Sequence, residues 1–502
     1  MGTTRRSFLT ALPLLAIGAS RSTLVSGSKT RRAPDFQTAR DTIREALASG
    51  NATGVAVAVV HNGGIVWEEG FGWANREARL KASAHTPFCL ASVTKPFTTT
   101  ALTTLAAEGR LRLDEPANAY LGRRALRGPE AGAATVRQLG AHAAGLPSLF
   151  EMYPVGAGVH SPTPDELLAG YGTLAYPPGR LYEYSNIGYA ALGVIASTLT
   201  GLEIGSVITQ HLLEPLGLRD SFFDTDRTRL SRAAARYDEL NRPIPYYTTA
   251  TPASGELYAS AHDLARFAMF NLKNLATDRH PVLSERWIDE LHAPVLHGPS
   301  AGATTFGWFS GSTKSGLPVL FKDGGQPGVS TIMYLVPSAN LACLVVANRT
   351  DNGDLVQTLV DHLVAAVQPE WTTPDTSMSP PRSAFSARGE YAGQWTGRLS
   401  GGQADMKFQL EISTRSGAGA TFSLGDGAPS NLSNLQLEGA ALIGRAAGAL
   451  SAAGAPLEGA KVLSLKLLPY SRGLTGRLLA SSSSPGMLAA TPSTVTLQRS
   501  QT

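Results

Sequence analysis

The strand-like segments of this 502-residue chain lie far apart in the sequence, and this separation constrains the fold more than any other feature. An uninterrupted apolar, β-branched run at residues 55–60 predicts a buried strand, and the His-Asn-Gly-Gly turn after it leads into a second strand at 65–67. The middle of the chain predicts mostly helices and loops. Strand character then returns at residues 317–321, 330–336 and 341–347. One sheet must therefore be assembled from both ends of an α/β domain of about 340 residues.

Five segments of the same domain have the apolar spacing of helices. The clearest stop signal is Gly109, a plausible C-terminal cap for the segment that begins at Ser92. The five predicted helices cover residues 36–48, 92–108, 192–199, 262–272 and 355–367.

The composition changes beyond this domain. Residues 369–386 are rich in Pro and Ser and predict a linker. Residues 401–502 carry only 13 charged side chains, and short β-like runs alternate there with Gly and Ser, at 406–412, 461–468 and 493–497. They predict a small all-β domain, a barrel or a sandwich. We therefore expect a leader at 1–33, the α/β domain at 34–368, the linker, and the all-β domain at 387–502.

The basic character of the chain is concentrated in the leader. Residues 1–32 hold six Lys or Arg and no acid, so the remainder has 43 − 6 = 37 bases against 39 acids, a net charge of −2. The net charge of the residues after the leader thus gives no reason to expect nucleic-acid binding.

The leader also carries a targeting pattern. Arg5-Arg6-Ser7-Phe8-Leu9 opens an apolar stretch of 11 residues, which resembles a twin-arginine export signal. The alternative is a plain basic tail. The stretch is shorter than the ~20 residues that a membrane span needs, and no later apolar run reaches ~18. We expect an exported protein, periplasmic or extracellular, with no stable membrane span after processing.

The sequence shows no motif that is typical of a cofactor or metal site. The ten histidines lack His-Glu-x-x-His spacing, and no nucleotide-binding fingerprint is present, so we predict neither a cofactor nor a metal. The only two cysteines, Cys89 and Cys343, lie in apolar surroundings. This favours two free thiols in the core over a single disulfide.

The first chemical motif is Ser92-Val93-Thr94-Lys95, at the predicted start of a helix. Three-residue spacing on a helix places both side chains on one face, with the amine within reach of the hydroxyl. Desolvation or a neighbouring cation would lower the pKa of Lys95 and let it accept the hydroxyl proton. The alternative is an N-cap serine beside a solvated lysine. The S-x-x-K pattern alone is weak evidence for a catalytic site, because Ser26 and Lys29 have the same spacing.

Two further motifs follow along the chain. Tyr184-Ser185-Asn186 is the only Tyr-x-Asn sequence, and its phenol could relay a proton if cations lower its pKa. The alternative is a packed aromatic ring. Lys322-Asp323-Gly324-Gly325 sets a cation before glycines that permit close backbone approach to a ligand. For Lys322, a surface cation at the end of a strand is an equally good interpretation.

In this order the three motifs resemble the serine β-lactamase and penicillin-binding protein superfamily, especially its class C-like branch. The resemblance spans about residues 36–368. It implies an antiparallel sheet flanked by helices with a mostly helical subdomain, and the C-terminal part resembles the small β-barrel of some members. It further implies hydrolysis of a small-molecule or peptide-like ester or amide through an acyl-enzyme.

The resemblance also assigns roles to the motif residues. Ser92 would be the nucleophile, Lys95 its proton acceptor, and Tyr184 the general base and acid. Asn186, Lys322 and Gly324 would bind substrate, and the N–H groups of Ser92 and Gly325 would form the oxyanion hole.

One departure from the family pattern bears on the substrate. Asp323 replaces a hydroxyl residue that could bind a substrate carboxylate. If Asp323 faces the site, it would repel β-lactams and D-Ala-D-Ala termini and favour neutral or cationic substrates. Burial could instead protonate it, or Lys322 could pair with it. Because of Asp323, a catalytically silent binding or sensor protein stays open as the alternative function.

A second candidate nucleophile matches a known sequence pattern. Gly298-Pro299-Ser300-Ala301-Gly302 matches the G-x-S-x-G elbow, but this elbow needs a strand before the serine and a helix after it. We predict a loop and a chance match, which leaves His142 without a serine partner and so structural.

Overall fold

The computed structural model describes residues 34–158, 160–224, 227–275, 282–385, 390–402, 404–413, 419–448, 462–484 and 487–500. The predicted leader, 1–33, lies outside the described residues. From Phe36 onward the chain forms one compact unit, which contains two nine-stranded sheets.

The first sheet joins both ends of the hydrolase-like part, as the sequence predicted. Its strand order is β3-β2-β1-β14-β13-β12-β11-β10-β9, and its neighbouring strands are antiparallel. Val55 of β1 pairs with Ala347 of β14, almost 300 residues later in the sequence. The strands are β1 (Gly54–His61), β2 (Gly64–Asn75), β3 (Leu80–Lys81), β9 (Leu296–His297), β10 (Ala303–Thr304), β11 (Phe309–Ser312), β12 (Pro318–Gln326), β13 (Val329–Val336) and β14 (Leu341–Ala347).

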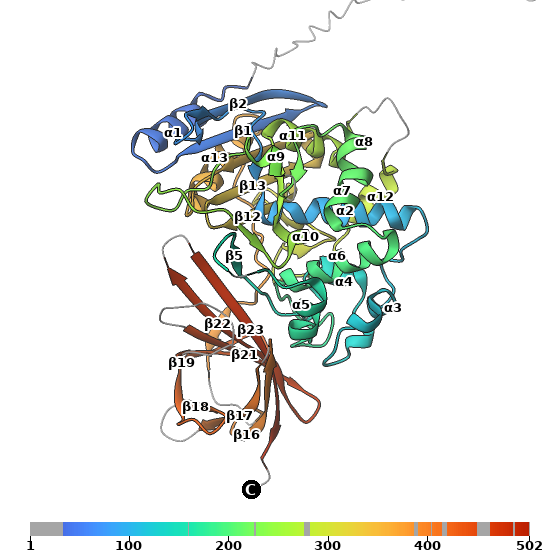
Figure 1. Cartoon of the computed structure of the whole chain (residues 1–502), viewed down its shortest axis with the longest axis vertical. Coiled ribbons are helices and arrows are strands. Elements are labelled where there is room, and N and C mark those ends of the chain that lie inside the picture. The colour runs from blue at the N-terminus through green and yellow to red at the C-terminus, as the bar shows by residue number, and fades with distance from the viewer. Residues whose placement is uncertain are drawn as a thin grey trace, which may run out of the picture. The chain divides into compact units, whose positions relative to one another are not determined.

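The central strand β1 is apolar on both faces because each face covers a separate core. Ala56, Ala58 and Val60 contribute to the core on one side, which includes α11 (Ala261–Asn271). Val55, Val57 and Val59 contribute to the other core, formed with α1 (Gln37–Ala48) and α13 (Gly353–Ala365). These helices and strands can be followed in Figure 1. The alternation of a strand thus explains the unbroken apolar run.

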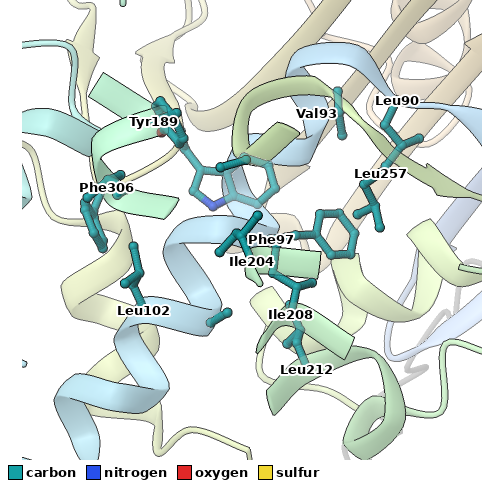
Figure 2. Close-up of a cluster of buried hydrophobic side chains, with 14 of the residues drawn as sticks. Leu90, Val93, Phe97, Leu102, Tyr189, Ile204, Ile208, Leu212, Leu257 and Phe306 are labelled. Carbon is teal, nitrogen blue, oxygen red and sulfur yellow. The ribbon is translucent and has the colours of Figure 1, made fainter. Parts of the chain in front are cut away.

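Helix α2 (Thr94–Ala107) is the centre of the helical region. Its residues from Thr94 to Ala106 are all buried, so it is covered on every side. Figure 2 shows Phe97 and Leu102 of this helix among the apolar side chains that surround it. Other helices of the part of the chain that the structure describes are α3 (Asn118–Leu121), α4 (Val136–Gly140), α5 (Pro164–Tyr171), α6 (Asn186–Thr200), α7 (Ile204–Ile208), α8 (Glu214–Leu216), α9 (Arg227–Leu230), α10 (Pro252–Gly255) and α12 (Glu285–His292).

Short strands in this region were not predicted. β4 (Phe88–Cys89) and β6 (Phe222–Phe223) both pair with β8 (Leu257–Ala259), and β5 (Met152–Pro154) pairs with β7 (Tyr247–Thr249). Strands of two or three residues are too short to show an alternating pattern.

The second sheet closes into a barrel. Its order runs β19-β18-β17-β16-β23-β22-β21-β20, and β19 also pairs with β20, which joins the two ends. Closure removes the exposed edges that an open sheet would present, and it decides between the two predicted all-β forms. The strands are β16 (Gly393–Gly401), β17 (Ala404–Ser413), β18 (Gly419–Leu424), β19 (Ser430–Glu438), β20 (Ala441–Ala447), β21 (Val462–Tyr470), β22 (Gly473–Ser484) and β23 (Met487–Arg499), with β15 (Arg382–Ala384) added at β19.

Both cysteines are free and buried, as predicted. Among the described residues no single helix is long and apolar enough to cross a membrane. The bent pair Asn186–Thr200 and Ile204–Leu216 meets that test by length and composition alone.

Candidate active site

Ser92 lies in a tight 3₁₀ turn, Ala91–Val93, just before α2. The sequence predicted the serine within the helix, which in fact begins two residues later, at Thr94. Ala91 has a φ of 45°, a left-handed conformation that costs a non-glycine residue ~1 kcal/mol. Val93 and Phe97 are buried in the core beside this turn, as Figure 2 shows. Packing therefore holds a strained turn in place.

Hydrogen bonds from two sheets fix the same turn. The Leu90 N–H donates to the Leu257 carbonyl at 2.9 Å, and the Thr331 hydroxyl donates to the Leu90 carbonyl at 2.8 Å. Leu257 belongs to β8 and Thr331 to β13. The position of Ser92 is therefore set by strands that come from distant parts of the chain.

Lys95 is fully buried in the first turn of α2, with 0% of its surface exposed. Its Nζ lies 3.0 Å from Ser92 Oγ. It also donates to Asn186 Oδ1 at 2.8 Å and to the Ser254 carbonyl at 3.1 Å. The alternative of a solvated surface lysine is therefore wrong.

The surroundings of Lys95 favour the uncharged amine. Burial, and then the charge of Lys322, lower its pKa well below the ordinary value, while Asp323 opposes the shift. A neutral amine has two N–H donors and one lone pair. Asn186 Oδ1 and the Ser254 carbonyl are pure acceptors that can take the two N–H groups. The lone pair is then available to the Ser92 hydroxyl.

Tyr184 completes the group from the segment before α6. Its Oη lies 2.6 Å from Ser92 Oγ. From the sequence, a proton relay through the phenol was expected only if cations lower the pKa of Tyr184. That condition is not met, because burial raises this pKa and the hydrogen bond from Ser92 only partly offsets the rise. Tyr184 is therefore a neutral phenol, whose hydroxyl can both donate and accept a hydrogen bond.

His142 supports Tyr184 from behind. The two rings stack with centroids 4.3 Å apart, and His142 Nδ1 accepts the Ser185 N–H at 3.1 Å. Burial, followed by the charges of Lys95 and Lys322, lowers the pKa of His142 well below its usual range. A neutral imidazole in these contacts fits the predicted structural role.

Lys322 lies on β12, which continues past the predicted end at 321 and through the glycines to Gln326. The side chain is buried, so the alternative of a surface cation is wrong. Its Nζ is 5.4 Å from the centre of the Tyr184 ring and 3.5 Å from Asp323 Oδ1. Burial lowers the pKa of Lys322, and Asp323 opposes this shift.

The two glycines after Lys322 differ in what they permit. A Cβ on Gly324 would overlap the Leu90 carbonyl oxygen and lie 2.9 Å from Ser92 N, so this glycine lets β12 approach the serine turn. A Cβ on Gly325 would meet nothing within 4 Å. Gly325 borders the cleft beside Ser92, where a side chain would occupy ligand space.

The sequence model of the Beta-lactamase family matches residues 39–367, well over half of the chain. The chain belongs to the β-lactamase family. Members of its superfamily, which also includes the penicillin-binding proteins, are typically serine hydrolases.

Relatives support this membership. Protein flp of Staphylococcus aureus (strain MW2) is 28% identical over 342 residues, which are 66% of this chain and 66% of flp, so the chain spans slightly less than two thirds of that relative. The structure of SurE has a TM-score of 0.65 at 20% identity and covers 91% of this chain and 98% of SurE. SurE has also been solved with D-Leu. A class C β-lactamase has a TM-score of 0.57 at 19% identity, covering 67% and 97%. These structures share the fold.

Two hollows lie at the predicted site of this β-lactamase-family protein, one beside Ser92 and one beside Tyr184. One is a narrow cleft lined by Ser92 itself and by Leu149, Phe150, Glu151, Met152, Asn186, Thr249, Ala250, Thr251, Ser254, Gly325 and Gln326. The other, of about 380 Å³, is lined by four aromatic rings, by the exposed Asp323 and by a segment after β14. Its lining residues are Tyr182, Tyr184, Phe309, Phe321, Asp323, Thr376, Ser377, Met378 and Ser379. Asp323 thus faces a hollow that also contacts Tyr184.

The barrel contacts the segments that border these hollows. Glu183, next to Tyr184, pairs with Arg477 and lies 3.6 Å from Lys466 Nζ. Phe150 and Ala490 exchange backbone hydrogen bonds of 2.9 and 2.8 Å. The barrel therefore fixes both the segment before α6 and one wall of the cleft.

The structure brings all seven predicted site residues together, and their chemical roles stay predictions. Sequence reasoning missed the Ser254 carbonyl, because a backbone acceptor has no side-chain signature. It also missed Phe309, whose ring lies 4.5 Å from Lys322 Nζ. The rival Ser300 lies exposed between β9 and β10, two strands, with no helix after it as the elbow requires.

Proposed function

We propose that the protein hydrolyses an amide or ester through an acyl-enzyme on Ser92. One observation carries this proposal: Ser92 Oγ lies within 3.0 Å of both Lys95 Nζ and Tyr184 Oη, and the pKa of Lys95 is lowered well below its ordinary value. A buried amine near a hydroxyl, with no carboxylate bonded to it, is suited to accept a proton at neutral pH.

In the first step, Ser92 Oγ attacks the substrate carbonyl carbon as its proton passes to Lys95 Nζ. The carbonyl oxygen becomes an oxyanion, and the N–H groups of Ser92 and Gly325 stabilise it. The C–N or C–O bond then breaks as the Tyr184 phenol gives its proton to the leaving group, and Lys95 returns a proton to Tyr184. An ester of Ser92 remains.

In the second step, water attacks the same carbonyl carbon. Its proton passes through Tyr184 and Lys95, the bond to Ser92 Oγ breaks, and Ser92 recovers its proton as the carboxylic acid leaves. Both steps need the phenol form of Tyr184, which its raised pKa favours.

A fluorophosphonate probe tests the nucleophile. We expect covalent labelling of the full chain, lost in Ser92→Ala and retained in Ser300→Ala, the matched control in the elbow-like sequence. A folded chain that is not labelled would instead support the alternative of a catalytically silent binding protein. Labelling that is lost in Ser300→Ala would identify Ser300 as the nucleophile.

We further propose that the substrate is neutral or cationic at the position that faces Asp323. This carboxylate is exposed to the hollow beside Tyr184, and Lys322 is 3.5 Å away, so it is only partly neutralised. A substrate carboxylate placed there meets repulsion. The D-Leu bound in SurE supports testing D-aminoacyl amides and esters as well.

The comparison of a p-nitrophenyl ester with nitrocefin tests this substrate class. We expect the ester to be hydrolysed faster, and Asp323→Thr to raise the ratio of nitrocefin to ester turnover about tenfold, the discrimination that ~1.4 kcal/mol provides. Glu411→Gln, at an exposed position on the barrel, is the control. Efficient nitrocefin turnover by the parent would refute the proposal.

We also propose that residues 1–33 export the protein to the periplasm or the medium. Replacing Arg5 and Arg6 by lysine should retain it in the cytoplasm in a twin-arginine-competent host. Unchanged export of the double variant would overturn this.

A further inference from the structure

A second group of chemically active side chains lies outside the motif residues. Glu68 of β2, His85 before β4 and His262 in the first turn of α11 each offer one ligand atom, and these atoms lie within 4.8 Å of one another. His262 Nδ1 is 2.9 Å from Glu68 Oε2, and His85 Nε2 is 4.0 Å from Glu68 Oε1. Glu68 and His85 come from the start of the chain, and His262 lies almost 200 residues after Glu68 in the sequence.

The backbone fixes the two histidines opposite each other. Phe88 of β4 pairs with Ala259 of β8 in an antiparallel ladder. The ladder ends at Ala259, because α11 begins at Ala261 and contains His262. The His262 N–H donates to the Ala84 carbonyl at 3.1 Å, and the two imidazole rings are 4.6 Å apart. The backbone hydrogen bond between His262 and Ala84 therefore holds the two histidines close together, and their approach does not depend on long, freely rotating side chains.

A carboxylate outside the group orients one imidazole. His85 Nδ1 lies 2.9 Å from Asp220 Oδ2, and the Ser260 hydroxyl also donates to that oxygen, at 3.4 Å. With Nδ1 bonded to Asp220, Nε2 of His85 is the nitrogen that faces Glu68. A carboxylate on the far nitrogen of a histidine is the usual support of a metal ligand, because it fixes the tautomer and raises basicity.

We propose that Glu68, His85 and His262 bind one divalent transition-metal ion, with Zn²⁺ the best match. Two imidazoles and a carboxylate form a ligand set that Zn²⁺ uses, and water can complete a tetrahedron because His85 is 58% exposed. Nitrogen-rich donors disfavour Mg²⁺ and Ca²⁺. No metal was expected from the sequence, because the histidines lack the close spacing of a metal motif on one helix.

The expected effect of this ion is structural. The ligands on either side of the β4–β8 pair lie next to the segments that lead to Ser92 and from Ser254. An ion that binds only the folded chain raises its melting temperature in proportion to the logarithm of free metal. Fluorophosphonate labelling of Ser92 does not involve the ion.

Titration of the EDTA-treated full chain with Co²⁺, followed by visible absorption, and competition with Zn²⁺ test the proposal. We expect one ion per chain, tetrahedral Co²⁺ bands, and a rise in melting temperature with Zn²⁺. His85→Ala and His262→Ala should each weaken binding at least tenfold, and Asp220→Asn about tenfold through ligand orientation. His297→Ala, an exposed histidine elsewhere, should change nothing.

Three results would overturn the site: no binding by the parent, binding that survives in both histidine variants, or equal weakening by His297→Ala. Thermal melts without metal show whether each variant folds. If one histidine variant does not fold, Glu68→Gln removes the anionic ligand while keeping the size of the side chain, and its affinity decides the question.

Discussion

Lys95 in the active site and Lys466 in the barrel are both buried, and their partners are opposite in kind. Lys95 Nζ contacts a hydroxyl, an amide oxygen and a carbonyl. Lys466 Nζ lies 2.7 Å from Glu438 Oε1 and 3.6 Å from Glu183 Oε2. Burial alone would raise the pKa of Glu438, but its bonds to Lys466 and Arg382 lower it. A buried amine bonded to neutral groups is set up to gain and lose a proton, whereas one with carboxylate partners holds structure.

The largest expected effect is the loss of chemistry in Lys95→Met. Removing the proton acceptor should slow ester hydrolysis and fluorophosphonate labelling by ~10³-fold, the scale of general-base catalysis. Stopped-flow labelling and a thermal melt of the same sample measure rate and folding. Lys407→Met, at an exposed barrel position, is the matched control. A folded Lys95→Met variant that labels within tenfold of the parent would contradict the comparison.

The next effect is on stability, in Lys466→Met. This change leaves Glu438 and Glu183 buried with one arginine each, and removing one partner of a buried ion pair costs ~3 kcal/mol. Urea unfolding of the variant and of Lys407→Met measures the difference. Labelling by the folded fraction should stay within a few-fold of the parent. A loss of labelling as large as that of Lys95→Met would show that both lysines serve catalysis.

The contacts of Lys95 could be predicted in part from the sequence, whereas those of Lys466 could not. Ser92 and Lys95 are three residues apart, so helix geometry alone predicts that they meet. Lys466, Glu438 and Glu183 come from β21, β19 and the segment before α6. No local pattern links them, because their contact depends on the closed barrel and on its placement against that segment.

The fold shows the same division. Long apolar runs such as β14 were predicted, because seven buried residues in a row require a strand covered on both faces. The two-residue strand β4 was not, although it positions both the Ser92 turn and His85. The 3₁₀ turn at Ala91 also escaped prediction, because tertiary hydrogen bonds to Leu90 and packing of Val93 hold it there.

A smaller effect is expected on the pH profile, where the charge of Lys322 can be distinguished from its contacts with substrate. Lys95 must be neutral to accept a proton, so kcat/KM rises as pH increases through its pKa. The charge of Lys322 lowers that pKa. In Lys322→Gln the pKa of Lys95 should rise and the acid limb of the kcat/KM profile should move to higher pH. The midpoint of the limb is the readout, since the height also reflects substrate binding. Lys407→Gln should leave the midpoint in place.

The smallest predicted effect has the opposite sign and involves Asp323, a carboxylate that acts on both active-site lysines. Its charge opposes the lowering of the Lys95 pKa, and it ranks below burial and Lys322 among the causes. In Asp323→Asn the acid limb should therefore move to lower pH, by less than Lys322→Gln moves it upward. A pH profile with an uncharged ester measures both shifts on one substrate. An upward shift in Asp323→Asn would contradict this prediction, because the loss of a negative charge cannot by itself raise the pKa of Lys95, and the contrast with Lys466 would fail at this point. A downward shift would keep Lys95 distinct from Lys466. The pKa of Lys95 would then be set by the charges of neighbouring residues, and not by an ion pair in which Lys95 itself takes part.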